Sequence, residues 1–183
     1  VDIRLNIAGR HNVRNALAAA ACTLAQGVPV EAIVRGLAAF EPVNGRLRRT
    51  HTAQGVPLID DTYNANPDSM RAAIDVLADQ PAPRLMVMGD MGETGAQAEA
   101  FHREVGEYAV SRAIEQVWAV GKDMKAAAQA GGVQHWETVE ALLAEHPQAP
   151  AGIASILVKG SRFMKMERIV RAWADVALLQ GEH

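Results

Sequence analysis

The 183-residue chain has one cysteine, a low aromatic content of 4% and no long run of apolar residues. With Cys22 alone, a disulfide framework within the chain is excluded, and a reducing compartment such as the cytoplasm is expected. Cys22 lies in an alanine-rich segment, where we expect it to be a small buried apolar residue. No apolar run approaches the roughly 20 residues that cross a bilayer, so we expect no membrane insertion. We also expect no secretory signal, because no basic segment followed by an apolar one opens the sequence.

The charge balance is nearly even, with 18 Lys and Arg against 21 Asp and Glu and a net charge of -3. A broad basic surface for nucleic acid is therefore not expected, and any anion must be bound locally. The histidines lack the close spacing that metal ligands share, so no metal site is expected. Three tryptophans far apart in the sequence are expected to pack in or beside the core: Trp118, Trp136 and Trp173.

The first part of the chain has a helical pattern. Residues 1–7 alternate apolar and charged side chains, which predicts a half-buried strand. Apolar and alanine-rich segments then predict helices over residues 15–26 and 30–40, with Gly27 ending the first. The PVNG sequence at residues 42–45 interrupts the pattern and predicts a domain boundary.

Beyond residue 45, predicted strands alternate with predicted helices. This order is typical of an α/β fold, and we expect a Rossmann-like, doubly wound, mostly parallel sheet with helices on both faces. The predicted strands are 48–52, 57–60, 85–88, 116–120, 132–135 and 155–158. The predicted helices are 69–78, 96–113, 122–130, 138–145 and 164–179.

The segment LIDDTYNANPDS at residues 58–69 has the most unusual sequence in the chain. It predicts a strand that ends on two carboxylates, then a turn and a helix. Polar groups past the carboxyl end of a strand are where open α/β sheets bind ligands. Asp60 and Asp61 either bind a ligand or cap the turn, and Asn64 and Asn66 either bind a ligand or serve turn chemistry.

Three further segments have the same ambiguity. His11 and Asn12, in GRHNVRNA, either cap a helix or contact a planar base. Arg46, in GRL, is either a surface cation or a residue that reaches a phosphate group. The KGSR segment that begins at Lys159 follows an apolar strand, where Lys159 and Ser161 can donate to an anionic ligand at a helix start.

A glycine-rich loop, GDMGETG, occupies residues 89–95 but lacks the spacing of a dinucleotide-binding loop. We interpret it as a connecting loop and assign no catalytic role to Glu93 or His102. A Gly-x-x-x-x-Gly-Lys-Ser/Thr phosphate loop is absent from the 183 residues. The chain by itself is therefore expected to lack the phosphate chemistry of an ATP-dependent enzyme.

The segments GRHNVRNA, GRL, LIDDTYNANPDS and KGSR, in this order, resemble the Mur ligase family, and most closely its ligases that add D-alanyl-D-alanine. The resemblance implies that residues 1–45 are the C-terminal tail of a central ATPase domain and that residues 46–183 are the Rossmann-like C-terminal domain. Two alternatives stay open. One is a related ligase that adds a single amino acid, and the other is a non-catalytic module that binds a nucleotide or peptide.

The resemblance implies a cytoplasmic, ATP-dependent amide-bond ligase of peptidoglycan precursor synthesis. Its substrates would be UDP-N-acetylmuramoyl-tripeptide and D-alanyl-D-alanine, joined through an acyl phosphate, with Mg²⁺ ligands mainly in a central domain outside this chain. We expect a monomer without a nucleic-acid partner, and no ligase activity from the 183 residues alone.

The resemblance also implies roles for particular residues. Arg46 and Lys159 are the expected catalytic residues. The expected nucleotide contacts are His11, Asn12, Asn15, Arg46 and Asp61. The expected substrate contacts are Tyr63, Asn64, Asn66, Lys159 and Ser161.

Overall fold

The computed structural model describes residues 2–174, and the chain forms two compact units, Val1–Val43 and Asn44–His183. The first unit contains two helices, α1 (Arg10–Ala25) and α2 (Val30–Ala38). The strand predicted at residues 1–7 was wrong, because the described residues 2–7 form no strand. Extended chain forms a strand only when a neighbouring strand supplies its hydrogen bonds, and this segment has no such neighbour among the described residues.

Helix α1 differs from its prediction at its start and in its burial. It begins at Arg10, directly after Gly9 with φ 100°, so His11 and Asn12 lie in the first turn and do not cap the helix. It ends before Gly27, whose φ of 77° suits a glycine after a helix. Cys22 is exposed, contrary to expectation, because none of the residues of α1, all of them described, is buried. Two helices alone leave most of each helix surface to solvent.

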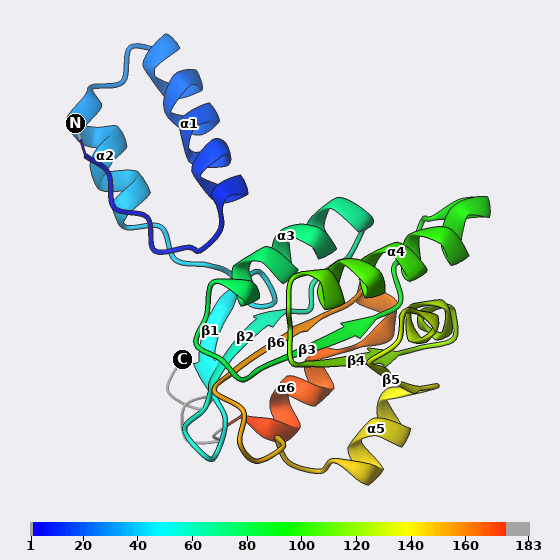
Figure 1. Ribbon diagram of the computed structural model, residues 1–183. Helices are drawn as coiled ribbons and strands as arrows, with labels where there is room; N and C mark the ends of the chain where they lie inside the picture. Colours follow the sequence, from blue (N-terminus) through cyan, green and yellow to red (C-terminus); the bar gives the residue numbers. More distant parts are fainter. Residues whose placement is uncertain (1, 175–183) are drawn as a thin grey trace. The chain divides into compact units, whose positions relative to one another are not determined.

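The second unit is built on a six-stranded sheet in the order β1-β2-β6-β3-β4-β5 (Figure 1). Only the edge strand β1 is antiparallel to its neighbour, and the other described strands run parallel, so the predicted mostly parallel sheet is confirmed. The strands are β1 (Arg48–His51), β2 (Pro57–Asp61), β3 (Arg84–Gly89), β4 (Gln116–Val120), β5 (Val133–Trp136) and β6 (Ser155–Lys159).

Helices cover both faces of this sheet, as a doubly wound fold requires. Figure 1 shows α3 (Pro67–Ala78) and α4 (Ala98–Ser111) on one face and α5 (Val139–Glu145) and α6 (Glu167–Trp173) on the other. Three short 3₁₀ segments complete the unit: η1 (Gly95–Gln97), η2 (Asp123–Ala130) and η3 (Arg162–Met164). No helix among the described residues is long and apolar enough to cross a membrane.

Two predicted helices need correction. In place of the helix predicted over residues 122–130, Asp123–Ala130 form the tighter 3₁₀ segment η2, which packs against α4. Its alanines allow a close approach, and a Cβ on Gly106 of α4 would lie 2.8 Å from the Cβ of Ala127. The helix predicted from residue 164 begins at Glu167, because η3 and the left-handed Lys165 precede it. Its predicted end at residue 179 lies outside the described residues.

Side chains alternate between the two faces of the sheet and form a core on each. On β3, Leu85 and Val87 join the core beneath α5 and α6, while Met86 and Met88 are buried on the opposite side. The three tryptophans meet in the first of these cores, and the ring centres of Trp136 and Trp173 lie 5.1 Å and 5.9 Å from that of Trp118. The prediction that the tryptophans pack in or beside the core is confirmed.

The chain reverses its winding between β3 and β6, which are adjacent and parallel. The helix that follows β3, α4, covers one face of the sheet, and the helix that follows β6, α6, covers the other. Loops that leave neighbouring strands toward opposite faces open a crevice at the carboxyl ends of the strands. The fold therefore places a binding crevice where β2, β6 and β3 end.

Candidate functional site

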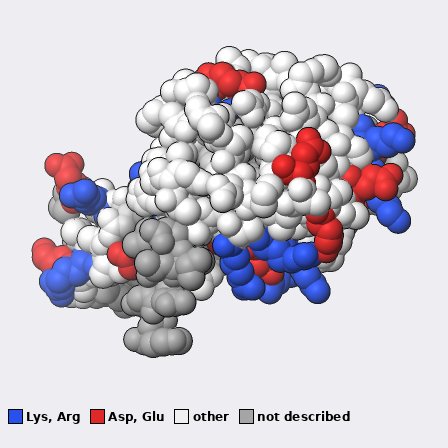
Figure 2. Space-filling model, turned by 90° about the horizontal axis from the view of Figure 1, so that it is seen from below, with Lys and Arg blue, Asp and Glu red and all other residues white. Residues whose placement is uncertain are grey.

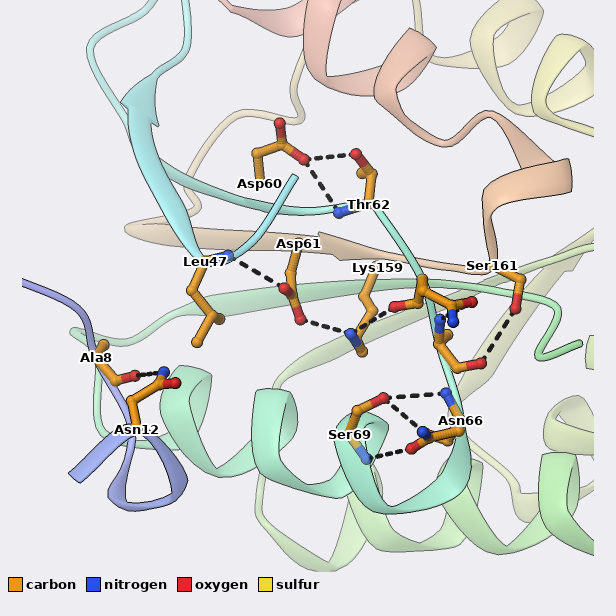
Figure 3. Close-up of polar contacts among 12 residues, drawn as sticks. Ala8, Asn12, Leu47, Asp60, Asp61, Thr62, Asn66, Ser69, Lys159 and Ser161 are labelled. Carbon is orange, nitrogen blue, oxygen red and sulfur yellow. Dashed lines mark hydrogen bonds and ion pairs between the residues drawn. The ribbon is translucent and has the colours of Figure 1, made fainter. Parts of the chain in front are cut away.

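The two neighbouring carboxylates at the end of β2 have different partners (Figure 3). Asp60 accepts hydrogen bonds from the backbone N and Oγ1 of Thr62, at 3.1 Å and 2.6 Å, and so caps the turn. Asp61 accepts from the backbone N of Leu47 at 3.1 Å and from Nζ of Lys159 at 2.6 Å. Asp60 therefore has a local role, whereas Asp61 joins three segments of the unit.

Lys159 is almost completely buried, with 3% of its surface exposed. Its Nζ donates to Oδ2 of Asp61 and, at 2.8 Å, to the backbone oxygen of Asn64. Burial raises the pKa of Asp61, and the neighbouring Lys159 ammonium acts in the opposite direction. The ammonium neutralises the buried carboxylate and fixes the loop after β2 to the end of β6.

Ser161 joins the loops that follow β2, β3 and β6. Its Oγ accepts from the backbone N of Gly92 at 2.6 Å and donates to the backbone oxygen of Ala65 at 3.1 Å. Its own backbone N donates to the oxygen of Asp90 at 3.0 Å. Because Ser161 is only 2% exposed, these bonds are shielded from water and hold the three loops in one arrangement.

The two asparagines of the loop after β2 form local hydrogen bonds. Oδ1 of Asn66 accepts from the backbone N of Ser69, and Oγ of Ser69 accepts from the backbone N of Asn66, at 2.8 Å and 3.0 Å. This capping box begins α3. Oδ1 of Asn64 accepts from the backbone N of Ala65 at 2.9 Å. The side-chain oxygen of each asparagine is thus engaged in a local hydrogen bond of the turn.

The glycine-rich loop after β3 is held by the buried His102, to which the sequence analysis assigned no catalytic role. Nε2 of His102 accepts from the backbone N of Met91 at 2.9 Å, and Nδ1 lies 2.6 Å from the oxygen of Ala98. The backbone N–H of Met91 can only donate, so Nε2 is the acceptor of this contact, and Nδ1 faces the oxygen of Ala98. His102 therefore anchors the loop to the first turn of α4.

Arg46 lies beside the loop after β2, within the second unit. Its guanidinium carbon is 4.3 Å from the centre of the Tyr63 ring, a cation–π distance. The backbone N of Tyr63 donates to the oxygen of Gly45 at 3.0 Å. A Cβ on Gly45 would lie 2.9 Å from that nitrogen, so the close approach requires glycine. Together with the bond from Leu47 to Asp61, these contacts fix the segment that contains Arg46.

The other predicted nucleotide contacts lie in the first unit, on the first turns of α1. Nδ2 of Asn12 donates to the oxygen of Ala8 at 2.7 Å, and Nδ2 of Asn15 lies 3.4 Å from Oδ1 of Asn12. His11 neighbours Asn12 in the same turn. The three residues therefore share one end of α1.

A cleft of about 950 Å³ lies where the three loops meet. Four of the predicted substrate residues line it, namely Tyr63, Asn64, Asn66 and Ser161, whereas Lys159 lies beneath them without lining it. The sequence reasoning missed several residues of its wall. These are Arg71, Glu93, Phe101, Arg162 and Phe163. Arg162 had a signal in the sequence, because it completes the KGSR segment, whereas Phe101 and Arg71 come from helices α4 and α3 and had none.

Two further observations concern metal ions and the distribution of surface charge. Between residues 2 and 174, no group of three or more His, Cys, Asp and Glu side chains is placed to hold a metal ion. On the face shown in Figure 2, basic side chains gather in separate groups beside acidic ones, without a continuous basic surface. The crevice at the ends of the strands is the candidate site in which the predicted substrate residues meet.

Comparison with known proteins identifies the family to which the chain belongs. The Mur ligase, glutamate ligase domain matches residues 45–162, which include every residue that lines the cleft except Phe163. The chain belongs to the Mur ligase family. Its similarity to individual family members extends over both units.

The chain is similar to two proteins named UDP-N-acetylmuramoyl-tripeptide--D-alanyl-D-alanine ligase. The one from Escherichia coli K12 is 46% identical over 175 residues, which cover 94% of this chain and 39% of the relative. The one from Haemophilus influenzae is 38% identical, over 96% of this chain and 40% of the relative. The chain thus spans about two fifths of the length of these Mur ligases.

Solved structures agree with this assignment. A crystal structure of MurF from Acinetobacter baumannii superimposes with a TM-score of 0.81 and 39% identity, covering 92% of this chain and 38% of that chain. MurF from Thermotoga maritima, solved in complex with ADP, gives a TM-score of 0.80 at 23% identity, over 93% and 39% of the two chains, and shows the shared fold.

Proposed function

We propose that this chain is the C-terminal part of an ATP-dependent ligase that adds D-alanyl-D-alanine to UDP-N-acetylmuramoyl-tripeptide in peptidoglycan precursor synthesis. The similarity to ligases of that name supports the proposal. The structural observation that carries it is the cleft where the loops after β2, β3 and β6 are joined by Ser161. Residues 1–45 would be the tail of the central ATPase domain, and residues 46–183 the C-terminal domain.

The proposed reaction forms one amide bond and consumes one ATP. The terminal carboxylate of the tripeptide attacks the γ-phosphorus of ATP, giving an acyl phosphate and ADP. The amine of D-alanyl-D-alanine then attacks the acyl carbon, and the tetrahedral intermediate loses phosphate and a proton as the amide forms. Exclusion of water would protect the acyl phosphate from hydrolysis, and we expect domain closure to provide it.

The proposed nucleotide contacts are Arg46 and Asp61 in the second unit, and His11, Asn12 and Asn15 in the first. Arg46 offers a guanidinium without an ion pair among the described residues, suited to the phosphate charge of the transition state. The His11 ring and the Asn12 and Asn15 amides have the chemistry to contact a purine. Asp61 already accepts two hydrogen bonds, so its main contribution would be to hold the Arg46 segment, with its remaining lone pairs free for a ribose hydroxyl.

We expect the ligands of the magnesium ions that such a ligase uses to lie mainly in the central ATPase domain, outside this chain. The described residues offer no cluster of three or more metal-binding side chains.

The acceptor side would be the cleft itself. Tyr63, Asn64, Asn66 and Ser161 form part of its wall, and Asn64 and Asn66 keep side-chain amide donors beyond their local bonds. Lys159 would act as a positioning residue, because its ammonium holds the backbone of Asn64. The proposed enzyme would work in the cytoplasm as a monomer.

Phosphate release by the full-length protein tests this function. With ATP, Mg²⁺ and UDP-N-acetylmuramoyl-tripeptide, we expect release that depends on D-alanyl-D-alanine and falls strongly in Asn64→Ala. Turnover with a single amino acid in place of the dipeptide would assign the chain to a related ligase. No turnover with either acceptor would contradict the enzymatic proposal and favour a binding module.

The 183-residue chain alone is a direct comparison for the full-length protein. It contains no phosphate loop, so we expect no phosphate release from it under the same conditions. Measurable turnover by the purified chain would contradict the proposed division of the catalytic residues between domains.

A further inference from the structure

The basic side chains around the cleft differ in what they already bind. Lys159 is buried and donates to Asp61 and Asn64. Arg71 lines the cleft, but it is paired with two carboxylates, Asp68 and Glu104. Neither cation has its charge free for a ligand. An anionic group that enters the cleft must therefore be bound by another residue.

Among the described residues, Arg162 is the least engaged cation of the cleft wall. Its side chain is 67% exposed, and its ion pair with Glu167, 3.5 Å from Nη1 to Oε1, is longer than a charge-assisted hydrogen bond. A guanidinium carries five N–H donors in a planar fork that matches a carboxylate. Arg162 therefore keeps donors for a bidentate contact with a ligand.

The backbone that carries Arg162 is fixed, although its side chain is exposed. The preceding residue, Ser161, is held by hydrogen bonds to Gly92, Ala65 and Asp90. A short 3₁₀ turn, in which the backbone N of Met164 donates to the oxygen of Ser161 at 2.9 Å, follows it. The exposed Arg162 side chain is thus attached to a fixed backbone at the edge of the cleft, which favours a defined contact geometry with a ligand.

Glu93 adds a negative charge to the adjoining loop of the cleft wall. It follows Gly92, whose backbone N donates to Oγ of Ser161, so the loops that carry Glu93 and Arg162 are directly joined. Glu93 has no ion pair within the described part of the chain. The cleft therefore offers one cation and one anion, which complement the two charged ends of a short peptide.

The rest of the wall suits small apolar side chains. Phe101 and Phe163 line the cleft, and Phe163 is 62% exposed. Methyl groups of a dipeptide could cover such a surface, and a longer or charged side chain would leave its polar atoms against the rings.

We infer that Arg162 binds the C-terminal carboxylate of the dipeptide acceptor, with Glu93 at its amine end. This inference rests on the proposed function, since it names how the acceptor cleft recognises its substrate. It makes Arg162 a specificity-determining residue. The enzyme would select an acceptor whose free carboxylate belongs to the residue that follows the reacting amino-terminal residue. Lys159, the lysine of the same segment, serves to shape the loop beneath.

The test compares two acceptors with the full-length protein: D-alanyl-D-alanine and its C-terminal amide, which lacks the carboxylate charge. Hydrogen bonds to charged groups contribute about 1.5–3 kcal/mol. The parent should therefore have a KM roughly 10- to 100-fold higher for the amide. In Arg162→Gln, the KM for the dipeptide should rise by a similar factor, and the two acceptors should become nearly equivalent, with kcat changed much less.

Three further variants separate this role from a structural one. Arg162→Lys keeps the charge but loses the fork, so it should recover part of the selectivity. Arg171→Gln removes one charge from the exposed surface of α6, outside the cleft wall, and should keep the parent selectivity. Glu93→Gln should raise the KM of both acceptors about equally, since both carry the amine.

The outcomes distinguish the inference from the function on which it rests. One outcome would contradict the assignment of Arg162 alone. In that outcome the parent uses the dipeptide, Arg162→Gln melts at the same temperature as the parent, and the variant disfavours the amide as strongly as the parent does. The proposed function would then stand. If the parent does not use the dipeptide at all, both are overturned.

Discussion

The two units of the chain contain similar helices but are stabilised in different ways. In the first unit, α1 buries none of its residues, all of which are described, and α2 buries Ile33. In the second unit, α3 alone buries five residues against the sheet. The comparison shows that a helical pattern is enough to form an element, whereas a core requires a further layer on which the apolar face can pack.

Their polar groups differ in the same way. In the first unit, Nδ2 of Asn6 donates to the oxygen of Ala38 in an exposed bond. In the second unit, Lys159 and Asp61 form a buried pair. An exposed bond exchanges readily with water, while a buried charge that loses its partner has no substitute. The same kind of substitution should therefore have unequal effects in the two units.

The largest effect is expected from Lys159→Ala, which leaves the Asp61 carboxylate buried without its cation. Breaking a buried pair on one side costs about 3–5 kcal/mol of unfolding free energy. Urea unfolding followed by tryptophan fluorescence measures it, because all three tryptophans lie in the second unit. The matched substitution in the first unit, Asn6→Ala, should change this transition by less than about 0.5 kcal/mol. Equal midpoints for the two variants would contradict the comparison.

A core substitution should have the next largest effect. Ile74 in α3 is fully buried, whereas Leu17 in α1 is 64% exposed. Ile74→Ala should lower the unfolding free energy by about 2–5 kcal/mol through lost burial and a residual cavity. Leu17→Ala, on a solvent-facing helix surface, should change it by less than about 0.5 kcal/mol. The same urea titration checks both, and a Leu17→Ala effect as large as that of Ile74→Ala would show a hidden contact of α1.

A smaller effect is expected at the start of α3, where Asn66 provides a side-chain cap that the start of α1 lacks. Asn66→Ala should cost about 1 kcal/mol. Asn66→Asp keeps an acceptor oxygen and should retain most of the stability, as thermal unfolding of the three proteins would measure. In the first unit, Gly9 precedes α1 without a side-chain cap, so Gly9→Ala tests backbone strain instead, at φ 100°.

The smallest effect concerns the surface of the second unit and depends on pH. Glu115 accepts from Nε and Nη2 of Arg84, at 3.0 Å each, and this pairing lowers its pKa to about 2. The pair therefore stabilises the folded protein above the unfolded pKa, near 4.3, and the stabilisation disappears as the pH falls through the folded value. Because the Glu115 side chain is 38% exposed, solvent limits the effect to below about 1 kcal/mol.

Glu115→Gln is the variant that measures it. Its melting temperature should lie slightly below that of the parent at pH 7, and the two should converge as the pH approaches 2–3. A difference that grows on acidification would show the opposite sign and refute the assigned cause. Unlike this pair, the ion pair between Lys159 and Asp61 is buried and shielded from salt. Added salt should therefore reduce the stabilisation by Glu115 and Arg84 but not that by Lys159 and Asp61.

The sequence predicted the second unit well because its signals are local. Apolar strands that end in polar turns, as at residues 57–61 and 155–159, are visible in the order of residues alone, and so is their alternation with helices. Four residues that the family resemblance implied as substrate contacts also line the cleft: Tyr63, Asn64, Asn66 and Ser161. The strand expected at residues 1–7 failed for the opposite reason, since pairing depends on a partner elsewhere in the chain.

The sequence by itself determined the alternation of elements, the positions of the polar loops and the family resemblance, since each of these depends on neighbouring residues. Only the tertiary structure decided that β6 lies between β2 and β3, and hence that Lys159 and Asp61, 98 residues apart, form one buried pair. It likewise decided how strongly each cation is engaged, because Arg71 and Lys159 form short ion pairs with carboxylates distant in the sequence, whereas the pair of Arg162 with Glu167 is longer, at 3.5 Å. The sequence gives the charge of each side chain. Whether that charge can bind a ligand depends on burial and on ion-pair partners, which only the packing of the chain decides.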